Sequence, residues 1–261
     1  MAPYATGESR WFRRFRPSRE AEITLVCLPH AGGTASFYLP LSELLPPTVE
    51  VLAVQYPGRQ DRLREPCIES VPEMARAVFD VLGPLAARRP VALFGHSMGA
   101  SVAFELAALL EREPGTPPRA LFASARAAPS LHRGGDIHRL DDAGLVAELH
   151  LLSGTDTQIL DQHELLQLVL PSIRSDYKAS ETYRAEPGAP LRCDIVALTG
   201  EADEQVPVEE AAGWRQHTTG GFTLRVFPGG HFYVTDHAEA VAAAITDTLC
   251  TAPARGGPTS G

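Results

Sequence analysis

Several residue types and patterns are scarce in this sequence of 261 residues. Lysine occurs once, at Lys178, and every other basic residue is an arginine. We attribute this bias to the codon usage of a GC-rich genome and not to function. The formal net charge is −9, and nucleic-acid binding depends on Lys and Arg at the phosphates. The composition therefore argues against a nucleic-acid partner.

Long hydrophobic runs are also missing. No stretch approaches the roughly 18 consecutive apolar residues of a membrane-spanning helix, and the first twenty residues contain no apolar run typical of a secretory signal. We therefore expect a cytoplasmic protein without a membrane partner.

Cysteine is limited to four positions, Cys27, Cys67, Cys193 and Cys250, and none of them forms a C-x-x-C pair. This spacing suits no zinc site, so we expect no metal. Cys27 and Cys193 lie in apolar runs typical of core strands. The simplest interpretation is that the cysteines are buried free thiols in a reducing compartment.

What is present is a regular alternation of strand and helix patterns. Apolar runs typical of strands lie at 22–28, 48–54, 90–97, 119–125, 194–200 and 222–227, and helical patterns lie at 36–45, 70–85, 98–110, 209–217 and 238–249. This alternation predicts an α/β fold with a mostly parallel sheet covered by helices on both faces. The expected domain is 21–251, between an Arg-rich N-terminal arm at 1–20 and a disordered tail at 252–261.

One region, about 129–185, contains no convincing strand. The segments 141–152, 162–170 and 171–183 have the spacing of successive amphipathic helices. An all-helical insertion at this point of an α/β chain suits a lid that excludes water from a site, although it could also be a helical subdomain packed on the sheet.

The strongest chemical signal is Gly95-His96-Ser97-Met98-Gly99, which matches G-x-S-x-G between an apolar strand and an apolar helix. This context is typical of the nucleophile turn of the α/β-hydrolase fold, with Ser97 as the nucleophile. The turn is so tight that its flanking residues must be small, which explains the glycines. We give His96 no catalytic role.

A serine hydroxyl needs a base that removes its proton, and that base needs a carboxylate to orient it. In this fold the acid and then the histidine follow the serine along the chain. His231, in the Gly-rich loop after the last strand pattern, is the candidate base, with His237 as the alternative. Asp203, in the loop after the strand pattern at 194–200, is the candidate acid. Its alternatives are Glu201 and Glu204.

The tetrahedral oxyanion of acyl transfer needs two donors. We expect the backbone N–H of Met98, directly after the nucleophile, and the backbone N–H of Ala31, in the Gly-rich loop Pro29-His30-Ala31-Gly32-Gly33. His30 is expected to position this loop and not to act as a second base.

Six segments in order resemble the type II thioesterases that accompany polyketide synthases and nonribosomal peptide synthetases. They are PHAGG (29–33), YPGRQDR (56–62), FGHSMGA (94–100), PSIRSDY (171–177), TGEAD (199–203) and PGGHFY (228–233). The resemblance implies Ser97, Asp203 and His231 as the triad, Met98 and Ala31 as the oxyanion hole, and a lid at 129–185. It also implies hydrolysis of stalled short acyl groups on the phosphopantetheine arm of acyl or peptidyl carrier proteins, with no cofactor. We expect a monomer.

Three other functions share this sequence pattern. A general carboxylesterase or lipase-like hydrolase would use the same triad, an acyltransferase would replace water by an alcohol or amine, and an inactive hydrolase fold would only bind. Acidic carrier proteins would be steered by a positive surface. Arg59, Arg62, Arg64 and the N-terminal arginine arm are the candidates for it.

Overall fold

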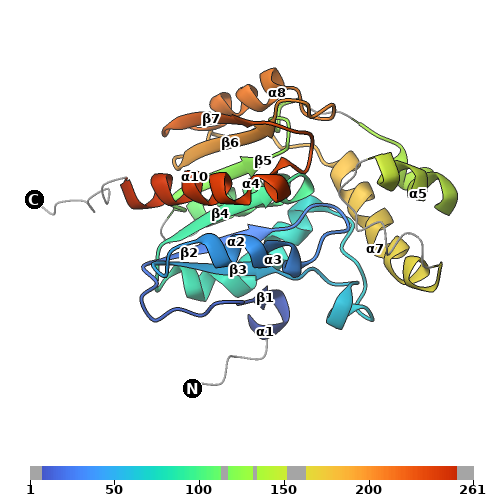
Figure 1. Ribbon diagram of the computed structural model, residues 1–261, viewed down its shortest axis with the longest axis horizontal. Coiled ribbons are helices and arrows are strands. Elements are labelled where there is room, and N and C mark those ends of the chain that lie inside the picture. Colours follow the sequence, from blue (N-terminus) through green and yellow to red (C-terminus); the bar gives the residue numbers. More distant parts are fainter. Residues whose placement is uncertain (1–7, 113–116, 132–133, 152–162, 252–261) are drawn as a thin grey trace, which may run out of the picture.

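A seven-stranded sheet organises the chain (Figure 1). The computed structural model describes residues 8–112, 117–131, 134–151 and 163–251. The strands are β1 (Phe12–Arg13), β2 (Ile23–Leu28), β3 (Val49–Val54), β4 (Val91–His96), β5 (Ala120–Ser124), β6 (Asp194–Gly200) and β7 (Phe222–Phe227). Their order is β1-β3-β2-β4-β5-β6-β7, and every neighbouring pair is parallel except β1 with β3. The predicted α/β fold with a mostly parallel sheet is confirmed.

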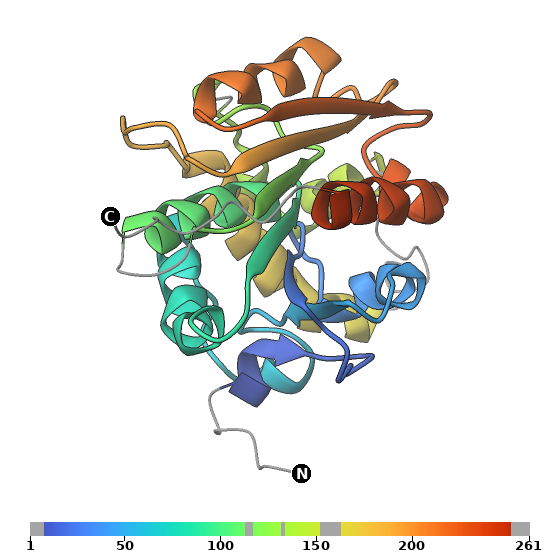
Figure 2. The same cartoon turned by 90° about the vertical axis from the view of Figure 1, so that its left-hand side faces the viewer.

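Helices cover both faces of the sheet, as Figure 2 shows with the sheet seen near its edge. One face carries α3 (Val71–Ala86) and α4 (Met98–Arg112), and the other carries α2 (Leu39–Leu44) and α10 (Ala238–Thr251). Successive strand side chains point to opposite faces, so Val26 and Leu28 of β2 pack in the first core and Leu25 and Cys27 in the second. The continuous apolar character of the central strands follows from this double burial.

Short helices occupy the connections at both ends of the strands. They are α8 (Val208–Ala212), α9 (Tyr233–Asp236) and the 3₁₀ turns Ala35–Tyr38, Gln60–Arg62 and Gly213–His217. The helix α3, which links β3 to β4, begins where the sequence predicts. The Ser70 side chain accepts a hydrogen bond from the Glu73 N–H, and Pro72 in the first turn has no N–H. Fewer N–H groups at the start of the helix are therefore left without an acceptor.

The region 129–185 forms a helical insertion between β5 and β6. Its described elements are a 3₁₀ turn (Ile137–Arg139), α5 (Asp142–Leu151) and α7 (His163–Thr182), which lie beyond one end of the sheet (Figure 1). The two helices predicted at 162–170 and 171–183 are one, because α7 continues through Pro171. Pro171 is exposed, so the carbonyl that loses its partner can reach water. Residues 152–162 of this region lie outside the described residues.

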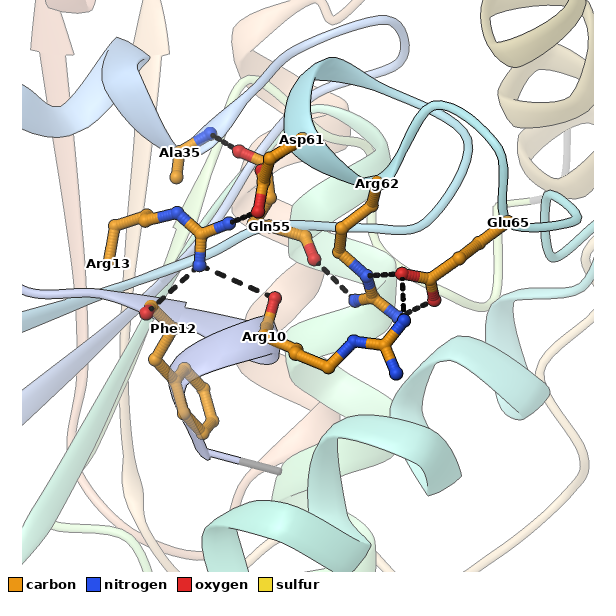
Figure 3. Close-up of polar contacts among 8 residues, drawn as sticks. All are labelled: Arg10, Phe12, Arg13, Ala35, Gln55, Asp61, Arg62 and Glu65. Carbon is orange, nitrogen blue, oxygen red and sulfur yellow. Dashed lines mark hydrogen bonds and ion pairs between the residues drawn. The ribbon is translucent and has the colours of Figure 1, made fainter. Parts of the chain in front are cut away.

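The N-terminal segment packs against the loop that follows β3. After α1 (Glu8–Trp11), β1 pairs with β3 and buries Phe12, while the Arg62 guanidinium lies 4.2 Å from the centre of the Trp11 ring. Arg10 bonds Glu65 and Arg13 bonds Asp61 (Figure 3). These arginines are therefore paired with acids of the following loop and do not form an unopposed positive surface.

Two smaller expectations concern thiols and membranes. All four cysteines are free thiols, but only Cys27 and Cys193 are buried. The expected burial is wrong for Cys67, which is half-buried, and for Cys250, which is exposed. Among the helices of the described residues, none has the length and apolarity to cross a membrane.

Candidate active site

The turn between β4 and α4 holds Ser97 in a strained conformation. Its φ is +54°, in the left-handed region that costs energy for a residue with a side chain. A Cβ at Gly95 would lie 2.2 Å from the Gly99 carbonyl oxygen, and one at Gly99 would lie 2.0 Å from the Leu28 carbonyl oxygen. Because backbone lies on both sides of the turn, only glycine fits at these positions, as the sequence predicted.

The three side chains proposed as a triad come together at the carboxyl ends of β4, β6 and β7. His231 Nε2 lies 3.0 Å from Ser97 Oγ, and His231 Nδ1 lies 2.9 Å from Asp203 Oδ2. The other carboxylate oxygen of Asp203 accepts hydrogen bonds from the Gln205 and Val206 N–H groups. The carboxylate is therefore fully buried and held in one orientation, and the imidazole bridges it to the serine.

The alternative acids and the alternative base make no described contact with the Ser97–His231 pair. Glu201 and Glu204 are exposed, whereas the Asp203 side chain is inaccessible to solvent. His237 stacks on Phe227 with ring centres 6.4 Å apart and makes no described contact with Ser97. Of the candidates that the sequence left open, the geometry favours Asp203 and His231.

The two backbone N–H groups expected as oxyanion donors belong to different elements, and Ala31 lines the same cavity as Ser97. Met98 is the first residue of α4, where the helix N-terminus favours negative charge. Ala31 lies in the loop after β2, between His30, whose carbonyl accepts from the Gly33 N–H, and Gly32, whose N–H donates to Asp176. Within the described chain, the N–H groups of Ala31 and Met98 have no protein acceptor. They remain available for an oxyanion.

Two further histidines surround this centre without adding charge to it. The His30 ring packs between Phe37 and Phe232, and desolvation there lowers the pKa of His30 to about 3, with a smaller contribution from the nearby positive charge of His231. His96 is completely buried, and burial lowers its pKa well below the ordinary value. Both imidazoles therefore stay neutral at neutral pH, and neither is placed as a second base.

A cavity of about 410 Å³ opens beside Ser97 and His231. The insertion supplies one wall through Ile137, Leu149 and Tyr177, and the domain supplies the other through Ala31 and Val206. This volume lies within the range of small-molecule sites. The cavity can therefore place an acyl chain next to the serine, between the sheet and the helical insertion.

Comparison with known proteins identifies the family. A family model described as thioesterase domain matches residues 23–249. The chain belongs to the thioesterase family. It is 50% identical over 247 residues to thioesterase PikA5 of Streptomyces venezuelae. The matched segment covers 95% of this chain and 88% of PikA5.

Solved structures give the same answer. The type II thioesterase BorB of the borrelidin biosynthetic cluster has a TM-score of 0.87 and 48% identity, with 95% of this chain and 100% of that chain covered. YbtT, a type II thioesterase of the yersiniabactin pathway, has a TM-score of 0.83 and 29% identity over 92% of this chain and 98% of that chain. The resemblance to type II thioesterases is confirmed, and the chain is a hydrolase that acts on thioesters.

Two arginines of this thioesterase were assigned wrongly from the sequence. Arg59 and Arg62 were candidates for a positive docking surface, but both are buried. Arg59 pairs with Asp176, and Arg62 pairs with Glu65 and donates to the Gln55 carbonyl. Of the three arginines in this loop, only Arg64 is exposed. A charge run indicates a solvated face only where no acid lies opposite it in the fold.

The sequence also missed a buried polar chain behind the nucleophile. His96 Nδ1 lies 2.9 Å from Ser124 Oγ, which lies 2.6 Å from the Tyr233 hydroxyl. The Ser124 carbonyl accepts the Ser97 N–H at 2.8 Å. Nothing in the local pattern at Ser124 or Tyr233 signals this network, because its members meet only when β4, β5 and α9 pack together.

Proposed function

We propose that this thioesterase uses Ser97, His231 and Asp203 to hydrolyse acyl groups from the phosphopantetheine arm of acyl or peptidyl carrier proteins. The observation that carries the proposal is the continuous contact from Asp203 through His231 to Ser97, at 2.9 and 3.0 Å. Members of the same family that resemble this chain over most of its length are type II thioesterases of polyketide and nonribosomal peptide pathways. Their setting supports a carrier-bound substrate.

In the acylation step, His231 Nε2 removes the proton from Ser97 Oγ as the oxygen attacks the thioester carbonyl. The carbonyl electrons move to oxygen, and the oxyanion accepts the N–H groups of Met98 and Ala31. Asp203 accepts from Nδ1–H and stabilises the imidazolium. Collapse of the intermediate breaks the C–S bond, and the departing pantetheine sulfur takes the proton from His231.

In the deacylation step, His231 removes a proton from water as the water oxygen attacks the acyl-serine carbonyl. The same two N–H groups hold the second oxyanion. Collapse breaks the bond to Ser97 Oγ, which regains a proton from His231, and the carboxylic acid leaves. Each bond change is handled by a group of this chain, so the proposed mechanism needs no metal ion and no redox cofactor.

The proposed substrates are short acyl groups that stall an assembly line, and the helical insertion is proposed to act as the lid over them. A cavity of about 410 Å³ walled by Leu149 and Tyr177 of the insertion supports both points. An enclosed site protects the acyl-serine from competing nucleophiles and strengthens its electrostatic interactions.

The test compares wild type with Ser97→Ala on a panel of acyl carrier proteins, scored by release of free acid. We expect hydrolysis by wild type and none above background by the variant. Matched thioester and oxygen-ester substrates separate this function from a general carboxylesterase. A clear preference for the oxygen ester, or full activity of the variant, would contradict the proposal.

A further inference from the structure

Two family-like segments that the catalytic argument left unused meet in a buried ion pair. Arg59 belongs to the segment YPGRQDR after β3, and Asp176 belongs to PSIRSDY on α7. Arg59 Nη1 lies 2.6 Å from Asp176 Oδ2, and Nη2 lies 2.9 Å from Oδ1. Both residues are buried, with 3% and 0% of their surface exposed. The two charges are thus matched in a bidentate geometry that fixes both side chains.

The same two side chains hold the loop that carries Ala31. Asp176 Oδ2 accepts the Gly32 N–H at 2.7 Å, and Arg59 Nη1 donates to the Gly33 carbonyl at 3.2 Å. Gly32 has a φ of +74°, and a Cβ there would lie 2.9 Å from Ile173 Cγ1, one turn before Asp176 on α7. The two residues directly after Ala31 are therefore held by hydrogen bonds, Gly32 to Asp176 of α7 and Gly33 to Arg59.

Stability alone does not explain such a pair. A buried ion pair contributes little net stability, because desolvation of both charges offsets their attraction, and apolar replacements of similar volume are often neutral or stabilising. An oxyanion donor, in contrast, must lie about 2.7–3.1 Å from the position that the developing charge will occupy. Positional precision of this kind needs a second layer of fixed hydrogen bonds.

We propose that Arg59 and Asp176 are a positioning pair that fixes the place of the Ala31 N–H in the oxyanion hole. Because Asp176 lies on α7, the pair also makes this geometry depend on the position of α7. The proposal rests on the proposed function, since the Ala31 N–H matters only if attack by Ser97 forms an oxyanion on the substrate carbonyl. Neither residue touches the substrate in this scheme. Their effect is on the transition state, through the loop between them.

The main variant is the double substitution Arg59→Met with Asp176→Leu, which removes both charges together and both hydrogen bonds to the loop. Loss of the two charges together costs little stability, so the thermal midpoint is expected to fall only by the cost of the two lost hydrogen bonds to Gly32 and Gly33. The kcat for an acyl-pantetheine thioester is expected to fall by at least about 10-fold. This loss is smaller than the roughly 10²- to 10³-fold loss in kcat that follows complete removal of an oxyanion donor. The KM is expected to change little.

Asp176→Asn is the second variant, because it changes no volume and retains an acceptor for the Gly32 N–H. It leaves the buried Arg59 charge without its carboxylate, so the thermal midpoint is expected to fall. Its fall in kcat is expected to be smaller than that of the double variant, because the Gly32 N–H keeps an acceptor. Lys178→Met is the matched control. Lys178 also joins α7 to the segment after β3, through Glu69, but this pair is exposed and makes no contact with the loop. Its kcat is expected to equal that of wild type.

The decisive readout is the affinity for a boronic acid that forms a tetrahedral adduct at Ser97, compared with that for an uncleavable acyl-pantetheine amide. If the Ala31 N–H is misplaced, the affinity for the boronic acid falls while the affinity for the amide is unchanged. If the cavity has collapsed, both affinities fall equally. The inference is overturned if the folded double variant keeps wild-type kcat, or if the boronic acid and the amide lose affinity in parallel. Inactive wild type, or an active Ser97→Ala variant, would instead refute the proposed function.

Discussion

Replacement of Asp203 by asparagine tests the orientation of the imidazole, because the structure dictates how the new amide must lie. One carboxylate oxygen of Asp203 faces two donors, the N–H groups of Gln205 and Val206, at 2.9 and 3.2 Å. An amide NH₂ at that position would place donor against donor. The NH₂ of Asp203→Asn must therefore point the other way, toward His231 Nδ1.

This orientation of the amide changes the tautomer of the His231 imidazole. With an NH₂ donor opposite it, Nδ1 has to accept, and the single proton of the neutral ring moves to Nε2. Nε2 then faces Ser97 Oγ, 3.0 Å away, as a donor and cannot remove the serine proton. The wrong tautomer of such a triad lowers kcat about 10⁴-fold, which corresponds to about 5 kcal/mol of transition-state stabilisation.

The assay is kcat on an acyl-pantetheine thioester at neutral pH, together with the thermal midpoint of each variant. Glu201→Gln is the matched control, since Glu201 is an exposed carboxylate of the same loop, and it should retain wild-type kcat. If a folded Asp203→Asn variant keeps a tenth or more of the wild-type rate, the tautomer argument is wrong. If Glu201→Gln is the inactive variant, the acid has been misassigned.

Two further predictions concern the turn that holds Ser97 and the loss of stability at low pH. Gly99→Ala places a Cβ 2.0 Å from the Leu28 carbonyl oxygen, so we expect a lower thermal midpoint and loss of activity. Gly83→Ala is the control, because a Cβ there meets no atom within 4 Å beyond its chain neighbours and the backbone of its own helix, and only the following residue, Pro84, opposes it. We expect Gly83→Ala to lower the midpoint far less than Gly99→Ala. Equal midpoints for the two variants would refute the packing argument. Hydrogen bonds from Arg62, helped by Arg10, lower the pKa of Glu65 from 4.5 to about 2 (Figure 3). Its stabilisation is present above the unfolded value and is lost as the pH falls through the folded one. The difference in unfolding free energy between wild type and Glu65→Gln should therefore be constant above pH 5 and disappear between about 4.5 and 2. A difference that persists at the lowest pH would rule this out.

The parts of the fold that the sequence predicts are those coded locally. The burial of β2 on both faces appears as a continuous apolar run, and the start of α3 appears as Ser70 followed by Pro72 and Glu73. β1 has no such signal, because its two residues form a strand only through pairing with β3. Pro171 gives the opposite error, because it predicts a helix end at a position where α7 continues. Whether a helix tolerates a proline depends on whether the carbonyl that loses its partner can reach water, and the sequence does not show this.

The same distinction applies to the site. Ser97 is recognisable because its turn constrains its neighbours, and Gly95 and Gly99 carry that constraint in the sequence. Asp203 and His231 follow from chain order and loop position. The role of Arg59 is invisible locally, because an arginine in a polar loop looks the same whether it faces solvent or an acid 117 residues away. Arg62 pairs with Glu65, only three residues along the chain, but its burial depends on the packing of Trp11 and the Gln55 carbonyl against it. Tertiary packing, and not residue type, decides both outcomes.

The attachment of α7 also bears on how a carrier-bound acyl group reaches Ser97. Movement of α7 would separate Asp176 from Arg59, and breaking a buried pair by removing one partner typically costs about 3–5 kcal/mol. It would also release Gly32 and so disturb the proposed oxyanion hole. The helix α5 is joined to α7 by an apolar cluster that includes Leu145, Leu149 and Leu170, and by an ion pair that is exposed at Asp142. If the insertion opens for its substrate, we therefore expect α7 to stay on the catalytic domain.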